Sequence, residues 1–296
     1  MQDMINYYIS SVIADGKSKC TVKAYTGDLK EFAEFVEQKI RKPLKELKPI
    51  DLRLWANSLE RRELAANSKA RKISSVKSFF AWLYDMECID RDPAASLKSP
   101  KIPKKQPKVI SVEDAKELLN FYRDEDCDRK TAFRDYAMIA MLLFTGIRRA
   151  EIADIMLNDV DMKRGVILIH GKGDKERNVY INDAIRPVLS EYLAVYRNMI
   201  KYATESEYLF PSNKSVKMNV GRVSAIVDKA MDAIGVKERG ISVHNLRKRF
   251  ATTVFNNTGD IATTSKLLGH SSPTVTMRYV DIGEDTKRAA AMAVGF

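Results

Sequence analysis

The first third of the chain carries hydrophobic residues at the spacing of α-helices. Apolar side chains recur every three or four residues over residues 21–40, 49–62 and 67–83, so one face of each segment can be buried. Ser18 precedes the first segment and can cap its amino end. The pattern therefore predicts an all-helical first domain.

The third of these helices combines an apolar face with a basic one. The apolar face consists of Ile73, Val76, Phe80 and Leu83, and the other face carries Lys69, Arg71, Lys72 and Lys77. A basic helix face often docks on a nucleic-acid duplex, although the usual explanation of such a face is plain solvation of charged side chains. The four basic residues are candidate DNA contacts.

The remaining two thirds predict a mixed domain. Ser111 can cap a helix that runs to about Tyr122, and a buried helix over residues 132–144 ends at Gly146. Residues 165–170 and 177–181 alternate as two strands of a hairpin around a polar turn. Helices occupy most of the rest. The expected fold is mainly α with a small β-sheet or hairpin: a helical amino-terminal domain followed by a mixed α+β domain.

A basic linker separates the two parts. Residues 99–108 contain three prolines, four lysines and no acid, a composition that resists helix formation and collapse. We therefore expect domains at 1–98 and 109–296. The linker is either a solvated tether or a segment that follows a phosphate backbone. In the second case Lys101, Lys104 and Lys105 contact DNA.

Charge and composition narrow the class of partner. The formal net charge is +11 and the sequence pI is about 9.4, values typical of proteins that meet a polyanion such as nucleic acid or an anionic membrane. The longest apolar run, residues 137–144, is far shorter than the ~20 residues of a membrane span. Three widely spaced cysteines and the lack of a signal peptide predict a cytoplasmic protein without disulfides.

Four short segments of the second domain contain candidate catalytic or phosphate-binding residues. In the first, Gly146 turns the chain and Arg148 begins a new helix. Glu151 lies three residues on, so it can hold the arginine fork in place, unless the two form an ordinary surface pair. In the second, the hairpin turn over residues 171–177 carries Lys172. It is not a nucleotide-binding P-loop, because it joins two strands, but it can bring an amine to a phosphate.

The other two stretches supply imidazoles and a phenol. His244 and Arg247 are three residues apart and share a helix face. Gly269 ends a later helix and is followed by His270. Pro273 suits the first turn of another helix, which would deliver Tyr279. No HxxxH, CxxC or acidic cluster predicts a metal site, and no GxSxG motif predicts a serine hydrolase. We expect neither metal nor other cofactor.

Together the stretches resemble the tyrosine recombinase (phage integrase) family, and most of all its Xer-type members. The family pattern is TG-[LIM]-R-xx-E, GKGxK, HxLR, LGH and a tyrosine nine residues later. Six residues match it in order: Arg148, Lys172, His244, Arg247, His270 and Tyr279. Residues 67–83 are similar to the DNA-gripping helix of the family's SAM-like core-binding domain. Lys248 stands where the family often has histidine, so altered contacts are expected there.

The resemblance implies a mechanism that uses neither metal nor ATP. Tyr279 attacks the scissile phosphate and forms a 3′-phosphotyrosine. Arg148 and Arg247 hold the nonbridging oxygens, and Glu151 supports Arg148. Lys172 protonates the leaving 5′-oxygen, His244 relays the tyrosine proton, and His270 hydrogen-bonds a phosphate oxygen.

The resemblance also implies partners. They are double-stranded DNA with paired half-sites and three further protomers, with the tail at residues 284–296 docking as a helix on a neighbour. The alternative for the tail is that it folds onto its own domain. Chromosome or plasmid dimer resolution and integration or excision of a mobile element both fit. The lack of a preceding arm-binding domain favours a simple Xer-like enzyme. A non-catalytic DNA-binding relative and a type IB topoisomerase are the alternatives.

Overall fold

The computed structural model describes residues 1–100, 108–123, 128–171, 176–270, 272–280, 288 and 291–292. The chain divides into two compact units, Met1–Lys104 and Lys105–Phe296. The predicted linker bounds of 99 and 108 stay a prediction, since residues 101–107 lie outside the described part. So do Lys101, Lys104 and Lys105, and most of the predicted docking tail.

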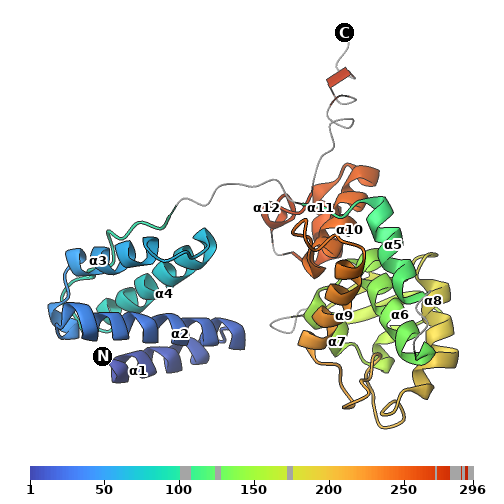
Figure 1. Ribbon diagram of the computed structural model, residues 1–296, viewed down its shortest axis with the longest axis horizontal. Coiled ribbons are helices and arrows are strands. Elements are labelled where there is room, and N and C mark those ends of the chain that lie inside the picture. The colour runs from blue at the N-terminus through green and yellow to red at the C-terminus, as the bar shows by residue number, and fades with distance from the viewer. Residues whose placement is uncertain are drawn as a thin grey trace. The chain divides into compact units, whose positions relative to one another are not determined.

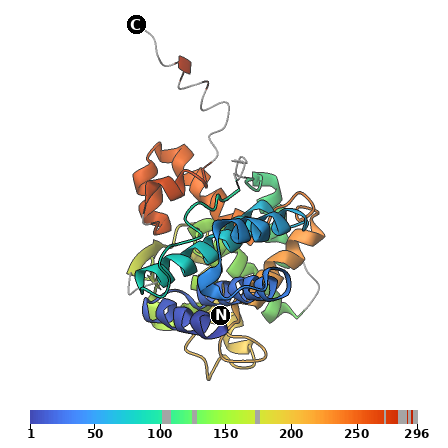
Figure 2. The same cartoon turned by 90° about the vertical axis from the view of Figure 1, so that its left-hand side faces the viewer.

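The first unit is built from helices, as the periodicity predicted. They are α1 (Gln2–Ala14), α2 (Lys19–Phe35, extended by a π-helical turn over Val36–Ile40), a 3-10 turn (Leu44–Glu46), α3 (Pro49–Glu60) and α4 (Ala66–Asp85). The α2 helix lies alongside α1 in both views (Figure 1 and Figure 2) and also contacts α4. Ser18 caps α2 as expected, because its Oγ accepts a hydrogen bond from the Thr21 amide at 3.1 Å.

Aromatic side chains fill the core of this unit. Trp55, Phe32 and Phe80 are at most 1% exposed, and the Phe32 ring packs edge-on against both of the other two. Burial of such large apolar surfaces is the main source of stability for a helical unit of this size. The core therefore fixes the direction of α4, the helix with the predicted basic face.

The second unit combines helices with a small sheet. Its helices are α5 (Val112–Arg123), α6 (Arg129–Thr145), α7 (Arg149–Asp154), α8 (Arg186–Glu191, continued by π and 3-10 turns to Met199), α9 (Val220–Ala233), α10 (Val243–Thr258), α11 (Ile261–Leu268) and α12 (Pro273–Thr276). The strands β1 (Val160–Asp161), β2 (Val166–His170) and β3 (Glu176–Tyr180) form one antiparallel sheet in the order β1-β2-β3. The predicted fold class, mainly α with a small sheet, is confirmed.

The α6 helix forms the centre of this unit. Residues 137–141 of α6 are completely buried, and α5, α8 and α10 all contact it (Figure 1). A helix that is apolar on every side must lie inside the protein. The carboxyl end of α6 at Thr145 therefore emerges from the interior, and it is where the first candidate stretch begins. In the described ranges, no helix is both long and apolar enough to span a lipid bilayer.

Candidate active site

Gly146 sets the direction of the chain at the end of α6. Its φ is 63°, a left-handed conformation that favours glycine, and an added Cβ would lie 2.4 Å from Cδ1 of Phe250. After this turn Arg148 occupies the amino-cap position of α7. The glycine thus brings the first candidate arginine to the end of a buried helix.

Glu151 holds Arg148, as its spacing predicted. One carboxylate oxygen accepts from the Arg148 amide at 2.7 Å, and the other accepts from Arg148 Nη1 at 2.6 Å. The second terminal nitrogen, Nη2, donates to the Gly269 carbonyl at 3.1 Å. The Arg148 side chain is 43% exposed, so its remaining donors can reach a ligand.

Arg177 of β3 binds the same carboxylate. Its two terminal nitrogens donate to the two Glu151 oxygens at 2.9 and 2.7 Å. Burial of Glu151 opposes ionisation, but hydrogen bonds from Arg177 and Arg148 outweigh it and lower the pKa of Glu151 to about 2. Glu151 is therefore a carboxylate throughout the physiological range.

Arg247 of α10 is buried, with 3% of its surface exposed. Its Nη1 donates to the Gly146 carbonyl and its Nη2 to the Leu268 carbonyl, both at 2.5 Å. Its Nε has no hydrogen-bond partner in the described part of the chain. Burial and the nearby Arg148 lower the pKa of Arg247 to about 10, so the group remains a cation at neutral pH. A buried donor without a partner costs free energy unless a ligand satisfies it.

His270 follows Gly269, which ends α11 with a φ of 64°. The His270 Nε2 lies 3.0 Å from Arg247 Nη2, and Nδ1 lies 2.8 Å from Thr276 Oγ1. Because arginine can only donate, Nε2 is the acceptor and the proton resides on Nδ1. Burial, Arg247 and Arg148 lower the pKa of His270 to about 4. The imidazole is therefore neutral at physiological pH.

Tyr279 lies between the two candidate histidines. Its ring centroid is 4.8 Å from that of His270 and 5.0 Å from that of His244. The Tyr279 carbonyl accepts from Thr252 Oγ1 of α10 at 3.3 Å, which ties the segment after α12 to that helix. Partial burial and the cations Lys248, Arg247 and Arg148 lower the pKa of His244.

Five of the six candidate residues thus meet at one place, the junction of α7, α10, α11 and α12. They are Arg148, His244, Arg247, His270 and Tyr279. Lys172, the sixth, lies outside the described residues. The third histidine, His170, ends β2, where it pairs with Asp159 at 3.0 Å and Glu176 at 2.9 Å.

Two residues of this site, Arg177 and Thr276, have no partner predicted from the sequence. Thr276 Oγ1 accepts a hydrogen bond from His270 Nδ1, and α12 contacts α11. A signal existed for Arg177: it stands two residues before Val179, so the two share a strand face. Val179 is 4% exposed, and an arginine on the buried face of a strand needs a buried partner.

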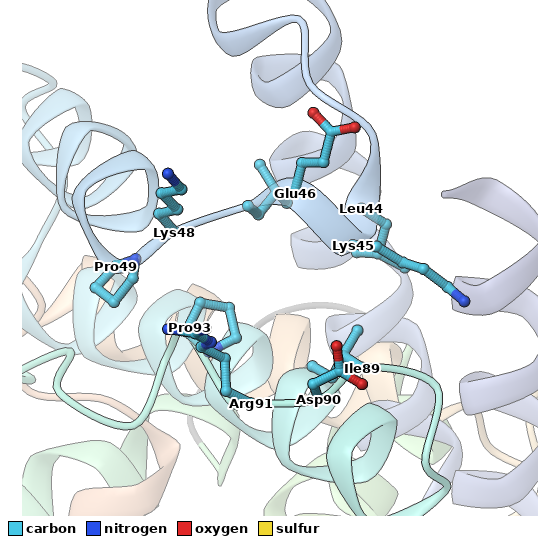
Figure 3. Close-up of a pocket in the computed structure, with 10 residues that line it drawn as sticks. Leu44, Lys45, Glu46, Lys48, Pro49, Ile89, Asp90, Arg91 and Pro93 are labelled. Atoms are coloured by element: carbon cyan, nitrogen blue, oxygen red, sulfur yellow. The ribbon is translucent and has the colours of Figure 1, made fainter.

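The described residues offer no metal site at this place. No group of three or more His, Cys, Asp or Glu side chains is arranged to hold a metal ion in the part of the chain that the structure describes. A pocket of about 390 Å³ lies in the first unit, between segments 44–49 and 89–93 (Figure 3). It contains none of the six candidate residues. The candidate site combines the half-exposed Arg148 with the buried Arg247, and this concentration of positive charge suits an anionic ligand.

The basic residues of α4 have partners inside the first unit. Lys69 pairs with Glu60 at 2.7 Å, and Lys77 Nζ donates to the Leu97 carbonyl at 3.1 Å. A DNA phosphate would have to compete with these partners. The assignment of these lysines as DNA contacts stays a prediction.

Arg71 and Lys72 surround a buried acid. Both contact Asp28, which is 2% exposed, and Lys72 also pairs with Glu31 at 2.7 Å. Lys72 is itself 9% exposed, because it lies one turn before the buried Val76 on the same face of α4. The basic face is therefore less open than its pattern indicates, and Arg71, with a side chain 44% exposed, is the freer of the two.

Both units match models of known protein families. Residues 108–285 match the model of the phage integrase family, and residues 5–87 match the model of the phage integrase amino-terminal SAM-like domain. The chain belongs to the phage integrase family.

The similar curated proteins are Xer-type enzymes. The tyrosine recombinase XerC of Thermodesulfovibrio yellowstonii is 33% identical over 270 residues, covering 90% of this chain and 87% of the relative. The tyrosine recombinase XerD of Proteus mirabilis is 30% identical over 285 residues, covering 95% and 89%. The protein is accordingly a tyrosine recombinase, an enzyme of site-specific recombination.

Solved structures agree on the fold. The XerA recombinase is 25% identical with a TM-score of 0.55, covering 99% of this chain and 98% of that one. The XerH recombinase, solved bound to its palindromic difH substrate, is 21% identical with a TM-score of 0.75, covering 91% and 78%.

Proposed function

We propose that this enzyme cuts and rejoins DNA strands through a 3′-phosphotyrosine on Tyr279. The observation that supports this proposal best is the convergence of two guanidinium groups, two imidazoles and one phenol at the junction of α7, α10, α11 and α12. A tyrosine nucleophile needs cations that hold a phosphate beside it, and this junction provides them. DNA is the polyanion that the net charge of +11 suits.

The two arginines would hold the nonbridging oxygens of the scissile phosphate. Among the described residues the buried Nε of Arg247 has no hydrogen-bond partner, and Arg148 is half exposed beside it. Charge-assisted hydrogen bonds from these donors strengthen as negative charge develops on the oxygens in the pentacoordinate state. Each such donor is worth roughly 3–4 kcal/mol in the transition state.

His244 would accept the phenolic proton of Tyr279, and His270 would hydrogen-bond an oxygen of the scissile phosphate. His244 is neutral at physiological pH, so it can accept the phenolic proton, which a free tyrosine releases only near pH ~10. His270 accepts from Arg247 in the free protein. A phosphate oxygen placed between them would replace that bond and raise the pKa of His270, so the ring could then donate to the oxygen.

Lys172 would complete the reaction. As the O–P bond to Tyr279 forms, the bond from phosphorus to the 5′-oxygen breaks, and the Lys172 ammonium protonates that oxygen. Attack of a 5′-hydroxyl on the phosphotyrosine reverses these steps and rejoins the strand. The phosphodiester energy is kept in the protein link, so no ATP is required.

The wider function follows from the Xer-type relatives. We propose a cytoplasmic enzyme that acts on double-stranded DNA with two half-sites of about 11 base pairs, roughly one helical turn each. Four protomers would assemble on two duplexes, each docking its carboxyl-terminal segment on a neighbour. Domains 1–98 and 109–296 would grip the duplex, with the linker along its backbone. Resolution of chromosome or plasmid dimers and movement of a genetic element are the two roles this chemistry serves.

A suicide substrate tests the proposal. DNA selected from random fragments by the purified protein gives the site, and a nick placed close to the cleavage point lets the short 5′-hydroxyl fragment diffuse away. We expect wild type to accumulate a covalent protein–DNA product and Tyr279→Phe to bind equally well without forming one. Binding without any covalent product in wild type would identify a non-catalytic DNA-binding protein. Relaxation of any supercoiled plasmid, regardless of the selected site, would identify a topoisomerase.

A further inference from the structure

Arg177 lies on the buried face of the sheet. It pairs in register with Ile169 of β2, and Val179 on the same face pairs with Ile167. Both isoleucines are at most 2% exposed, and the Arg177 side chain is only 14% exposed. A cation in this position needs a fixed anionic partner, because an unpaired buried charge is costly.

The partner is the carboxylate that holds Arg148. Arg177 contributes two parallel hydrogen bonds to Glu151, and Arg148 contributes one from its amide and one from Nη1. Four donors fix the carboxylate in position and orientation. The orientation of the Arg148 guanidinium therefore depends on Arg177, because Arg177 fixes the position of the Glu151 carboxylate that accepts from Arg148.

Arg177 also packs against the second group that holds Arg148. A Cβ added to Gly269 would lie 2.8 Å from Cδ of Arg177 and 3.1 Å from its Nε. The Gly269 carbonyl accepts from Arg148 Nη2 at 3.1 Å. One side chain thus contacts both residues that hydrogen-bond the Arg148 guanidinium.

The charge balance points to the same role. Arg148 and Glu151 together carry no net charge, so the carboxylate would cancel much of the attraction that Arg148 exerts on a phosphate. Arg177 adds a positive charge that keeps Glu151 ionised and leaves the trio with a net charge of +1. The nearby Arg247 cation and this net positive charge then both attract the phosphate.

We propose that Arg177 is a positioning residue for DNA cleavage, which holds Arg148 in the geometry that binds the scissile phosphate by fixing Glu151 and the Gly269 turn. The inference rests on the proposed function. It also connects β3 to the phosphate-binding arginine, and Lys172 precedes this strand by four residues in the sequence.

The test measures the rate of covalent complex formation on the nicked, selected DNA in single turnovers. The variants are Arg177→Met, which keeps the aliphatic stem, and Arg177→Lys, which keeps the charge but not the fork. Arg164→Met is the matched control: its side chain is 83% exposed and it lies in the turn before β2. Thermal unfolding and DNA affinity are measured for every protein. We expect Arg177→Met to bind the DNA within about threefold of wild type but to cleave about 10²-fold more slowly, as misplacement of a reacting group by about 1 Å does.

The pH dependence separates positioning from a merely structural role. Glu151 of wild type stays ionised over the whole assay range. Without Arg177, only the hydrogen bonds from Arg148 oppose the effect of burial, so the pKa of Glu151 rises and the cleavage rate of Arg177→Met should fall more steeply than that of wild type as the pH is lowered from about 7. Arg177→Lys should restore part of the rate and flatten the profile. Arg164→Met should match wild type.

Three outcomes would overturn the inference. Cleavage by Arg177→Met at the wild-type rate would show that Arg148 needs no such support. A loss of rate matched by an equal loss of folded protein, with the wild-type pH profile, would reduce Arg177 to a structural residue. If wild type itself forms no covalent complex on DNA that it binds, the proposed function fails first, and this inference with it.

Discussion

At the scale of single residues, the site uses arginines that are bound to the protein before any ligand arrives. Arg247 joins the carbonyls that end α6 and α11, and Arg148 is held by Glu151 and Gly269. Preorganised donors need no rearrangement when charge develops, which is the main electrostatic advantage of an active site over water. The same hydrogen bonds make these residues part of the folded structure.

Replacing Arg247 should therefore affect both activity and stability. In Arg247→Lys the charge remains, but the donors of one ammonium radiate from a single atom and lack the fork by which Nη1 and Nη2 reach two separate carbonyls. We expect cleavage of the nicked substrate to fall by about 10²–10³-fold, the usual effect of removing a transition-state donor. Thermal unfolding should shift to lower temperature. Tyr279→Phe, which leaves these hydrogen bonds intact, should lose cleavage alone, and equal unfolding temperatures for both variants would contradict this account.

His270 makes stability depend on pH in a defined range. Its pKa is lowered from 6.5 to about 4 in the folded protein. In this range the unfolded chain takes up a proton that the folded protein does not, so stability falls as the pH is lowered from 6.5 towards 4. His270→Gln removes this titration. Denaturant unfolding at several pH values should show wild type losing stability relative to the variant over that interval, and parallel curves would be evidence against a neutral imidazole at this position.

At the scale of elements, the sequence predicted most helices and strands because their periodicity is strong. It also placed Arg148 and His270 correctly next to helix ends and predicted a helix that begins at Pro273, since Gly146, Gly269 and Pro273 are clear boundary signals. That helix, α12, ends at Thr276, three residues before Tyr279. The sequence pattern missed α1 and the two-residue strand β1. The α1 helix buries only three side chains, and β1 is recognisable only once β2 is beside it. Arg177 could not be paired with Glu151 because no local spacing links β3 to α7.

The turn after α6 gives a test at this scale. Gly146 and Gly259 both end a helix with φ near 64°, so alanine at either position carries a left-handed backbone cost of about 1–2 kcal/mol. At Gly146 the new Cβ would also meet the Phe250 ring at 2.4 Å, whereas at Gly259 nothing lies within 4 Å. Gly146→Ala should therefore destabilise the protein more than Gly259→Ala in denaturant unfolding. Equal losses would show that the Phe250 ring moves aside freely.

At the scale of the whole molecule, the two compact units and the charge of the chain suit a protein that grips a duplex with both units. Composition predicts a linker over residues 99–108, because a run of proline and lysine without acids has few ways to pack, and these bounds stay a prediction. What composition did not reveal is how far basic residues are already paired, as Arg71 and Lys72 are with Asp28. The net charge of a chain does not show which of its cationic side chains are already paired with acidic ones and which can bind a phosphate.

The linker can be tested by its salt dependence. If Lys101, Lys104 and Lys105 bind phosphates, replacing all three by glutamine should reduce the slope of log K against log salt by about one for each phosphate that is no longer neutralised, or about three in total. Binding to the selected site would be measured by titration over a range of salt concentrations. An unchanged slope would identify the linker as a solvated tether.

Arg247 both joins the ends of α6 and α11 and is proposed to bind the scissile phosphate. These two roles limit how such an enzyme can lose its activity. A chain that drifts away from recombination while still binding DNA can replace Tyr279 by phenylalanine with little structural damage, since the ring that packs against Ala251, Leu268 and Val280 is kept and only the hydroxyl is lost. It cannot discard the Arg247 guanidinium so easily, because the ends of α6 and α11 would separate. Inactive descendants of this fold should therefore keep the buried arginine long after the nucleophile has gone.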